Sequence, residues 1–479
     1  MAEKKAVNKV VEPTNEEIDA YVDQLVSKAQ VALSKFEEFT QEQVDYIVAK
    51  CSVAGLDAHG TLAEAAINET GRGVFEDKAV KNLFACEYVT SNLRHLKTVG
   101  IINEDPLLGI TEIAEPVGVV CGIVPTTNPT STVIFKSLIC LKTRNPIIFS
   151  FHPSAHACSV MAAVVIRDAA VAAGAPEDCI QWLDMKSMYA TTALMKHPGV
   201  ATILATGGNA MVSAAYSCGK PALGVGAGNV PAYVEKTCVL PRAVNDIVLS
   251  KSFDNGMICA SEQAAIVDHE IYDDFMKEIK RFKVYFVNKD EKAKLEQFMF
   301  GAAAYSDNVN AAKLNPNVVG KPATWIAEQA GIKVPEDTQI ICAECAEVGP
   351  NEPLTREKLS PVLAILKASS TEDGILKSTQ MVEFNGLGHS AANHTENHEL
   401  SKRFGHACKA IRIIENAPST FGGIGSVYNA FIPSLTLGCG SYGHNSVSNN
   451  VSAINLINIK RIGRRNNNMQ WVKLPPKIY

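Results

Sequence analysis

Apolar residues recur at every third or fourth position through residues 14–95, as they do on the buried face of an amphipathic helix. The run IDAYVDQLVSKAQVAL shows this spacing clearly, and Thr14 followed by Glu17 resembles a capping box at the start of a helix. The period changes over 97–116, where GIINEDPLLGITEIAEP alternates apolar and polar residues around an Asp-Pro pair. Alternation on both sides of a turn predicts a β-hairpin. We therefore expect a helical entry segment followed by a hairpin.

From about residue 117 to 230, short β-branched runs alternate with longer helical stretches such as SAHACSVMAAVVIRDAAVAAGA. This alternation predicts βαβ units and a parallel sheet, whose ligand crevice lies at the carboxyl ends of the strands. Catalytic and cofactor-binding residues are therefore expected directly after strands. The predicted strands are VGVVCGIV, NPIIFS, CIQWLD, VATILA and ALGVG.

A second alternating region runs from about 260 to 440 and predicts a second α/β domain. Beyond it, residues 446–479 contain an alternating stretch, AINLINIKRI, and then a basic end that is rich in Asn and contains Pro. The first part is typical of a strand that pairs between subunits, and the second part is typical of a linker. The strands predicted in the second region are QAAIVD, TQIICAE, PVLAILKA and AIRIIE.

The chain has 479 residues and is 47% hydrophobic, which is enough to bury a large core over two or three structural units. Forty-five Lys and Arg against fifty Asp and Glu give a net charge of −5 without a long basic run, so nucleic-acid binding is not expected. The charged N-terminus, and the lack of any run of roughly 18 to 20 apolar residues, predict neither a secretory signal nor a membrane span. We expect a cytoplasmic protein that binds small molecules.

Thirteen cysteines are scattered without regular spacing, as in a cytosolic protein whose thiols are reduced. Cys342 and Cys345 form a lone CxxC without a second ligand pair, so no metal site is expected. Cys259 differs from the others because it follows Asn255 and Gly256 in the turn-like run FDNGMICASEQ. A thiol in such a turn is expected to be partly exposed and to have a lowered pKa, as a nucleophile requires. A buried and inert cysteine is the alternative.

The run FDNGMICASEQ resembles the nucleophile segment of CoA-acylating aldehyde dehydrogenases, specifically the aldehyde dehydrogenase half of bifunctional aldehyde-alcohol dehydrogenases. Seven further segments occur in that family's order, so the resemblance covers the whole chain. They are IVPTTNPTST, FSFHP, LATGG, GVGAGN, EKLSPVLA, GLGHSAA and SLTLGCGSYGHNS.

The resemblance implies an α/β, aldehyde dehydrogenase-like fold with a Rossmann-type NAD-binding domain, an α/β catalytic domain and a β-strand oligomerisation extension. It also implies a homo-oligomer and, in the full-length protein, fusion to an iron-dependent alcohol dehydrogenase domain. The boundaries that we assign are 1–96 with 117–256 for the NAD-binding domain, 257–445 for the catalytic domain, 97–116 with 446–466 for the extension, and 467–479 for a linker.

By the same resemblance, Cys259 is the nucleophile, and Asn128 in IVPTTNPTST stabilises the oxyanion together with the backbone N–H of Cys259. The alternative for Asn128 is that it only holds the Asn-Pro turn. His389 in GLGHSAA is the best candidate to deprotonate the CoA thiol or to tune Cys259, because a histidine titrates near neutral pH. Its alternative role is to line a pocket and hold a loop. His152 and His444 are weaker candidates.

Thr206, Gly207 and Gly208 follow the strand VATILA and precede a helical stretch, so their backbone N–H groups can approach a phosphate or the nicotinamide. A full GxGxxG at a first βα turn is absent, and the nearest glycine string, which includes Gly226, follows a later strand. NAD as the cofactor is therefore implied by the resemblance, because aldehyde dehydrogenases bind NAD without that fingerprint.

Glu357 in REKLSPV matches the family's carboxylate that hydrogen-bonds the nicotinamide ribose, although by itself it reads as an ordinary surface Glu. Ser150 and His152 end the second parallel strand, which in this superfamily faces the adenosine ribose. No acidic residue stands at 150–153 to reject a 2′-phosphate, so the preference for NAD over NADP rests on the resemblance.

The residue at position 225 predicts whether the acyl group of the enzyme thioester is transferred to CoA or to water. Hydrolytic members of the superfamily have a glutamate at this position when the chains are aligned on Pro231, and a valine cannot act as the general base for water. The thioester is then expected to persist until the CoA thiol attacks it. The resemblance thus implies an NAD-dependent acetaldehyde dehydrogenase (acetylating) that acts on aldehyde and acyl-CoA. Two alternatives are a hydrolytic aldehyde dehydrogenase that releases the free acid, and a chain that serves mainly as an assembly element.

Overall fold

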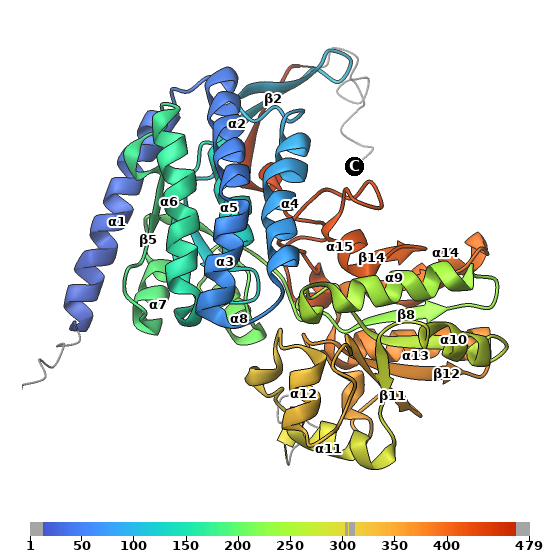
Figure 1. The fold of residues 1–479 in the computed structure, drawn as a ribbon. Coiled ribbons are helices and arrows are strands. Elements are labelled where there is room, and N and C mark those ends of the chain that lie inside the picture. Colours follow the sequence, from blue (N-terminus) through green and yellow to red (C-terminus); the bar gives the residue numbers. More distant parts are fainter. Residues whose placement is uncertain (1–12, 302–304, 306–311, 466–479) are drawn as a thin grey trace, which may run out of the picture.

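Three β-sheets organise residues 13–301, 305 and 312–465, which are those that this computed structural model describes (Figure 1). Thr14 and Glu17 form the predicted capping box at the first helix, and Thr40 with Gln43 forms another at the second. The predicted helical entry segment is therefore confirmed. Its helices are α1 (Asn15–Phe36), α2 (Gln41–Asp57), α3 (His59–Thr70) and α4 (Phe75–Leu93).

The first α/β unit contains a five-stranded parallel sheet in the order β5-β4-β3-β6-β7. The direction of the strand order reverses between β3 and β6, and ligands bind outside the carboxyl ends of the strands at such a point. Asn128 follows β3 there, and Thr206 follows β6. All five predicted β-branched runs form strands, namely β3 (Val119–Val124), β4 (Ile147–Phe151), β5 (Ile180–Trp182), β6 (Val200–Ala205) and β7 (Ala222–Gly224).

Helices cover both faces of this sheet. Val120 and Phe149 pack into a core with α2, α4, α5 (Pro129–Lys142) and α6 (His156–Ala172). Cys121 and Ile148, one position along each strand, pack instead against α1, α7 (Met188–Lys196) and α8 (Asn209–Tyr216). Burial on both faces explains why these strands are apolar at nearly every position rather than at alternate ones.

Among the described residues, the segment Pro153–Ala172 is long and apolar enough to cross a membrane by length and composition. The same helix places Ala162, Ala163 and Ile166 in the core beside the five-stranded sheet. A helix that packs in the core beside a sheet is expected to be apolar, so its composition does not indicate a membrane span.

The second α/β unit contains a seven-stranded parallel sheet in the order β10-β11-β12-β9-β8-β13-β14. Four of its strands were predicted, namely β9 (Glu262–Asp268), β11 (Ile340–Cys345), β12 (Val362–Ala368) and β14 (Ala410–Glu415). Sequence analysis missed the other three, which are β8 (Val230–Val234), β10 (Val284–Phe286) and β13 (Gly388–His394). The helices of this unit are α9 (Leu240–Ser252), α10 (Tyr272–Ile279), α11 (Lys289–Phe300), α12 (Ala323–Gln329), α13 (Thr371–Asn385), α14 (His398–Ala407) and α15 (Ser419–Ile424).

The predicted domain boundary at residue 256 does not coincide with the change of sheet. β7, which ends at Gly224, is the last strand of the five-stranded sheet, whereas β8, which begins at Val230, pairs with β9 and β13 in the seven-stranded sheet. The chain therefore changes sheet between these two residues.

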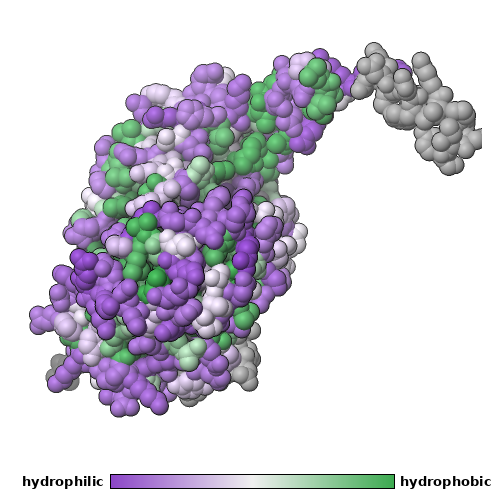
Figure 2. Space-filling model, turned by 90° about the vertical axis from the view of Figure 1, so that its right-hand side faces the viewer, coloured by the Kyte–Doolittle hydropathy of each residue, from purple (hydrophilic) through white to green (hydrophobic). Residues whose placement is uncertain are grey.

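A three-stranded antiparallel sheet combines the predicted hairpin with the predicted C-terminal strand. Its strands are β1 (Gly100–Asp105), β2 (Ile110–Pro116) and β15 (Ile457–Gly463). Figure 2 shows this extension reaching away from the body of the molecule, with hydrophobic atoms among hydrophilic ones. Leu107 at the hairpin tip is 95% exposed, and Ile101 and Ile462 are also exposed. The predicted linker at 467–479 lies outside the described residues.

Candidate active site

Cys259 lies in the short connection between α9 and β9, directly after a turn with unusual backbone geometry. Asp254 and Asn255 have φ values of 49° and 54°, and Gly256 has a φ of 68°. Three consecutive left-handed residues are costly for side chains with a Cβ, and Asn and Asp are the types that tolerate this conformation best. A Cβ at Gly256 would also lie 2.6 Å from the carbonyl oxygen of Ser360. The sequence Asp-Asn-Gly therefore matches what the turn demands.

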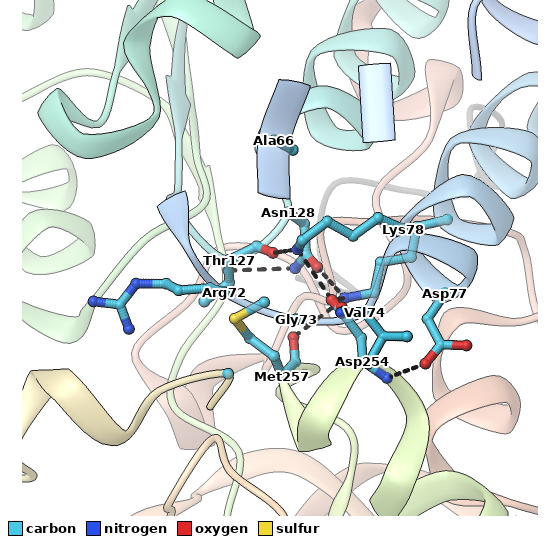
Figure 3. A network of polar contacts seen from close by, with 12 residues as sticks. Ala66, Arg72, Gly73, Val74, Asp77, Lys78, Thr127, Asn128, Asp254 and Met257 are labelled. Atoms are coloured by element: carbon cyan, nitrogen blue, oxygen red, sulfur yellow. Dashed lines mark hydrogen bonds and ion pairs between the residues drawn. The ribbon is translucent and has the colours of Figure 1, made fainter. Parts of the chain in front are cut away.

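Contacts with the N-terminal part of α4 hold this turn in place (Figure 3). The Asp254 carboxylate accepts a hydrogen bond from the backbone N–H of Val74 at 2.8 Å, and the Asp254 N–H donates to Asp77 at 2.7 Å. Lys78 donates to the same Asp254 carboxylate at 3.2 Å, and Lys81 forms a second, shorter ion pair with it. The helical entry layer thus sets the conformation of the segment that carries Cys259.

Cys259 is partly exposed and packs against an apolar cluster that includes Val225 and Cys439. Burial raises the pKa of the Cys259 thiol to about 12, the nearby carboxyl of Glu357 adds to that effect, and the guanidinium of Arg412 opposes it. The expected lowering of the thiol pKa is therefore wrong for the free protein. Its surroundings are apolar, and no helix N-terminus or dominant positive charge compensates for them.

Three predicted site residues of the second unit, Cys259, Glu357 and His389, lie around Gly228. A Cβ at this position would lie 1.8 Å from the carbonyl oxygen of Cys259 and 3.2 Å from Nδ1 of His389. Its backbone N–H donates to Oε1 of Glu357 at 3.0 Å. Cys259, Glu357 and His389 therefore surround one glycine. Burial raises the pKa of Glu357 to about 7, although its hydrogen bond from Gly228 opposes this shift.

His389 is buried on β13, and its two ring nitrogens differ in their surroundings. Nδ1 lies 3.0 Å from the hydroxyl of Ser390, and that hydroxyl accepts from Nε of Arg412 at 3.1 Å. Because the arginine always donates, the hydroxyl can give its own proton to Nδ1, which favours the tautomer with the proton on Nε2. Among the described residues Nε2 has no partner. Burial, aided by Arg412, holds the pKa of His389 well below its usual range, so its imidazole is neutral.

Asn128 stands at the N-cap position of α5, in the loop after β3 and at the predicted crevice; its side chain is half-buried and makes no capping hydrogen bond. Its side-chain oxygen accepts a hydrogen bond from Lys81 Nζ at 2.6 Å. The same ammonium contacts the carbonyl oxygen of Met257, two residues before Cys259, at 3.4 Å. Lys81 thus links the Asn128 loop of the first unit to the nucleophile segment of the second.

Thr206, Gly207 and Gly208 lie between β6 and α8, as predicted. The Thr206 hydroxyl is 2.9 Å from the hydroxyl of Thr436, which ties this loop to the segment that leads to Cys439. Gly208 has ordinary backbone geometry, and a Cβ there would meet nothing within 4 Å. The space in front of the α8 N-terminus is therefore open, and backbone N–H groups there can receive an anion.

Ser150 and His152 lie near the end of β4, as predicted, but they make local contacts. The buried hydroxyl of Ser150 is 2.8 Å from the hydroxyl of Thr191 on α7. The exposed His152 accepts from the backbone N–H of Ser154 at 3.2 Å and so caps a short turn. Within the described part of the chain, the structure does not bring either of them to Cys259.

A cavity of about 500 Å³ lies between α8 and segments of the second unit. Gly226 is part of its wall, and the Gly226 N–H donates to the sulfur of Cys439 at 3.4 Å. Cys439 belongs to the apolar cluster against which Cys259 packs, but neither cysteine is among the residues that line the cavity. His444 also lines it, as do Tyr216, Glu383, Leu387 and Tyr442.

Five residues that shape the site are not among those predicted. Lys81 and Asp254 hold the two reactive segments, Gly228 allows the close approach of Cys259 and His389, and Arg412 with Ser390 contacts His389. Asp254, Gly228 and Ser390 lie within the runs FDNGMICASEQ, GVGAGN and GLGHSAA, but the runs alone assign them no role, and Lys81 and Arg412 lie in none of the runs that carry the family resemblance. Only the left-handed signature Asp-Asn-Gly gave a usable signal, and it pointed to a turn rather than to an ion pair.

Comparison with known proteins agrees with this geometry. A family model described as the aldehyde dehydrogenase family matches residues 2–425. The chain is 70% identical over 481 aligned positions to an aldehyde-alcohol dehydrogenase of Streptococcus pneumoniae, covering 100% of this chain and 54% of that protein. The chain thus spans about half the length of this curated relative and of several others that it matches.

Two solved structures are similar over nearly the whole chain. An acetylating aldehyde dehydrogenase from Geobacillus thermoglucosidasius is 43% identical with a TM-score of 0.91, and the match covers 96% of this chain and 99% of that one. A propionaldehyde dehydrogenase from Rhodopseudomonas palustris, solved with bound CoA and an acylated cysteine, is 27% identical with a TM-score of 0.81. That match covers 92% of this chain and 97% of the other.

The raised pKa of the Cys259 thiol gives the first testable prediction. In the free protein, the rate of Cys259 alkylation by iodoacetamide should rise about tenfold per pH unit between pH 7 and 10, because the thiolate fraction rises in that proportion below the pKa. Peptide mass spectrometry measures this rate separately from those of Cys218 and Cys238, which are also partly exposed. A plateau below pH 8 would contradict the raised pKa.

The close packing at Gly228 gives the second prediction. In Gly228→Ala the new methyl group must displace the backbone of Cys259, which should lower the free energy of unfolding by about 1 to 3 kcal/mol. Cys259 alkylation at pH 9 should also change. Urea unfolding and mass spectrometry measure the two effects. Gly60→Ala is the matched control, since a Cβ at Gly60 meets nothing within 4 Å, and an unchanged Gly228→Ala protein would refute the assigned contact.

Proposed function

The chain belongs to the aldehyde dehydrogenase family, and on that basis we propose that it interconverts acetaldehyde, CoA and NAD with acetyl-CoA and NADH. One observation carries this proposal: the partly exposed Cys259 packs with Val225 in an apolar cluster, and its backbone packs against Gly228, which also lies against Glu357 and His389. The similar structure with CoA and an acylated cysteine supports a thioester intermediate in this chain too. Acetaldehyde is proposed because the aldehyde-alcohol dehydrogenases share up to 70% of the sequence.

The Cys259 thiol loses its proton to solvent, and the resulting thiolate attacks the aldehyde carbonyl and forms a hemithioacetal. The amide Nδ2 of Asn128 and the backbone N–H of Cys259 donate to the resulting oxyanion, and one such donor is typically worth ~3 kcal/mol. NAD, when bound, accepts the hydride that leaves the same carbon. Cys259 is then held as a thioester, and the CoA thiolate attacks its carbonyl and releases the Cys259 thiolate. The proton of the CoA thiol is lost to a base or to solvent, which completes the balance.

Val225 keeps the thioester from reacting with water. Its side chain is 5% exposed and lies in the apolar cluster around Cys259, so position 225 offers no base to a water molecule. This favours acyl transfer over the hydrolytic alternative, in which a glutamate at this position would activate water.

The open space before α8 fits NAD. A Cβ at Gly208 would meet nothing within 4 Å, and one at Gly207 would meet Met211 at 3.7 Å, so the described residues leave room beside these glycines for an anion at the start of α8. The Thr206 hydroxyl fixes the start of the loop through its contact with Thr436. Glu357 carries a second carboxylate oxygen beyond the one that accepts from Gly228, and that oxygen suits a ribose hydroxyl. Ser150 is engaged with Thr191, so it adds little to the preference for NAD over NADP.

His389 acts on the acyl-transfer half of the reaction. Its neutral imidazole touches the same glycine as Cys259, and the Ser390 hydroxyl orients it. With the proton on Nε2, the ring is placed to donate to a thiolate that enters or leaves the site. We therefore assign to His389 the orientation and stabilisation of the CoA thiolate rather than bulk proton removal.

The exposed β-extension supports a homo-oligomer. Its tip presents Leu107 and Leu108 to solvent, and its β1 edge has no neighbouring strand among the described residues. Pairing with another copy would cover both. In a longer protein the same chain would be followed by an iron-dependent alcohol dehydrogenase domain, in agreement with relatives of about twice its length. The thirteen free cysteines support a cytoplasmic location.

The third prediction tests the reaction itself. With acetaldehyde and NAD, steady NADH formation should require CoA, and the product should be acetyl-CoA rather than acetate. Cys259→Ala should lower the rate by at least about 1000-fold, because no thioester can form. Absorbance at the NADH band and chromatography of the products measure both effects. Equal turnover without CoA, or acetate as the sole product, would support the hydrolytic alternative instead.

The fourth prediction concerns His389. His389→Gln should leave the first turnover of NADH formation near the wild-type rate but slow steady turnover with CoA by roughly 10- to 100-fold. His394→Gln is the matched control, because His394 is a buried histidine on the same strand. Because the pKa of His389 is held well below its usual range, any inflection of the acyl-transfer rate near neutral pH belongs to another group such as Glu357 and should be the same in wild type and His389→Gln. Rapid-mixing kinetics separate the two steps, and loss of the first turnover in His389→Gln would contradict this role.

A further inference from the structure

Lys81 lies on α4, far in sequence from both reactive segments, yet its ammonium group lies between them. Its Nζ donates to Oδ1 of Asn128 at 2.6 Å, to the Asp254 carboxylate, and to the carbonyl oxygen of Met257 at 3.4 Å. The side chain is 3% exposed. One buried cation therefore contacts the oxyanion donor, the left-handed turn and the backbone beside the nucleophile.

The number of donors on Lys81 decides what it can do. An ammonium has three N–H groups, and within the described residues it has three oxygen acceptors. No donor is left for a substrate. Lys81 therefore does not stabilise the oxyanion itself and acts only through the groups that it holds.

The chemistry of these contacts also sets the orientation of the Asn128 amide. An ammonium donates and cannot accept, so the amide oxygen of Asn128 must face Lys81 and the amide nitrogen must face away from it. One N–H of that nitrogen reaches the Thr127 hydroxyl at 3.3 Å. The second N–H is then available on the side opposite Lys81, and an oxyanion requires such a donor.

The surrounding charges keep Lys81 protonated at neutral pH. Burial lowers the pKa of Lys81 to about 8, and the Asp254 carboxylate limits that decrease. Lys78 shares the same carboxylate at 3.2 Å and also donates to the carbonyl oxygen of Thr127 at 3.2 Å. The two lysines thus share the Asp254 carboxylate, but only Lys81 contacts the side chain of Asn128 and the carbonyl oxygen of Met257, and only Lys78 contacts the carbonyl oxygen of Thr127.

We propose that Lys81 is a positioning residue that orients the Asn128 amide for oxyanion stabilisation and ties it to the Cys259 segment through Asp254 and Met257. The inference rests on the proposed function, in which the amide nitrogen of Asn128 donates to the hemithioacetal oxyanion. Without Lys81 the amide can rotate, and it then presents its oxygen to the oxyanion in part of the population.

A double-mutant cycle tests this proposal in the full chain. Lys81→Met should lower kcat for CoA-dependent NADH formation by roughly 10- to 100-fold, and Asn128→Ala by roughly 100-fold or more. If Lys81 acts through Asn128, the double variant should be no slower than Asn128→Ala alone. KM for CoA and for NAD should stay within about twofold of wild type. Effects that multiply in the double variant would overturn the proposal.

Lys78→Met is the matched control, because it removes an equal charge from the same helix and the same carboxylate. It should lose stability to urea as Lys81→Met does, but its kcat should stay within about threefold of wild type. Equal losses of kcat in the two variants would show a general effect of the ion pair and would also overturn the proposal. If Lys81→Met does not fold, Lys81→Gln takes its place in the cycle, since its amide can still donate to one of the three oxygens.

CoA-dependent NADH formation by the wild-type protein distinguishes failure of the proposed function from failure of the role proposed for Lys81. A folded wild-type protein without CoA-dependent NADH formation contradicts the proposed function. An active wild-type protein whose Lys81 and Asn128 variants act independently contradicts only the role of Lys81. Alkylation of Cys259 by iodoacetamide should be similar in wild type and Lys81→Met, because Val74 and Lys78 still bind the Asp254 carboxylate and keep the turn before Cys259 in place. A strong change in that rate would show instead that Lys81 acts on the nucleophile.

Discussion

The buried carboxylate of Asp254 is the group on which the arrangement of the site depends. It accepts from two ammonium groups of α4 and from the backbone N–H of Val74. Asp254 and Asn255 both have left-handed backbone geometry, which costs roughly 1 to 3 kcal/mol per residue. Removing one partner of a buried ion pair costs about 3 to 5 kcal/mol, so these contacts are strong enough to hold the turn. Because α4 belongs to the helical layer and the turn leads into β9, the Asp254 carboxylate links the two α/β units at the site.

Burial, more than counter-charge, determines the protonation of the reactive groups. Desolvation is the largest cause of the raised pKa of Cys259, of the raised pKa of Glu357 and of the lowered pKa of His389. All three shifts favour the neutral form. Arg412 keeps its charge, and its Nε–H donates a hydrogen bond to the Ser390 hydroxyl. Burial thus disfavours the thiolate in the free protein, and the Cys259 thiol must lose its proton before it can attack a carbonyl.

The pattern of apolar residues predicted the strands that are apolar at every position. It did not predict central strands that contain polar residues or proline. Sequence analysis missed β8 because Pro231 interrupts its apolar run, and the register of the strand shifts between Val230 and Pro231 to accommodate the proline. It missed β13 because Ser390, Asn393 and His394 make the run look polar, although every residue of this strand is buried. Their burial comes from the layers on both faces of the sheet, and no local pattern encodes those layers.

The reactive residues could be found from short motifs, whereas the residues that orient them could not. Asn128 follows a strand and Cys259 follows a turn signal, so local sequence and the family resemblance locate both. Lys81 and Asp254 are 173 positions apart, and each looks like an ordinary surface charge until the fold buries it. An isolated buried charge is costly, so the pair is informative only once both partners are placed together. A motif therefore identifies which side chains can react, whereas only the three-dimensional contacts show how those side chains are oriented.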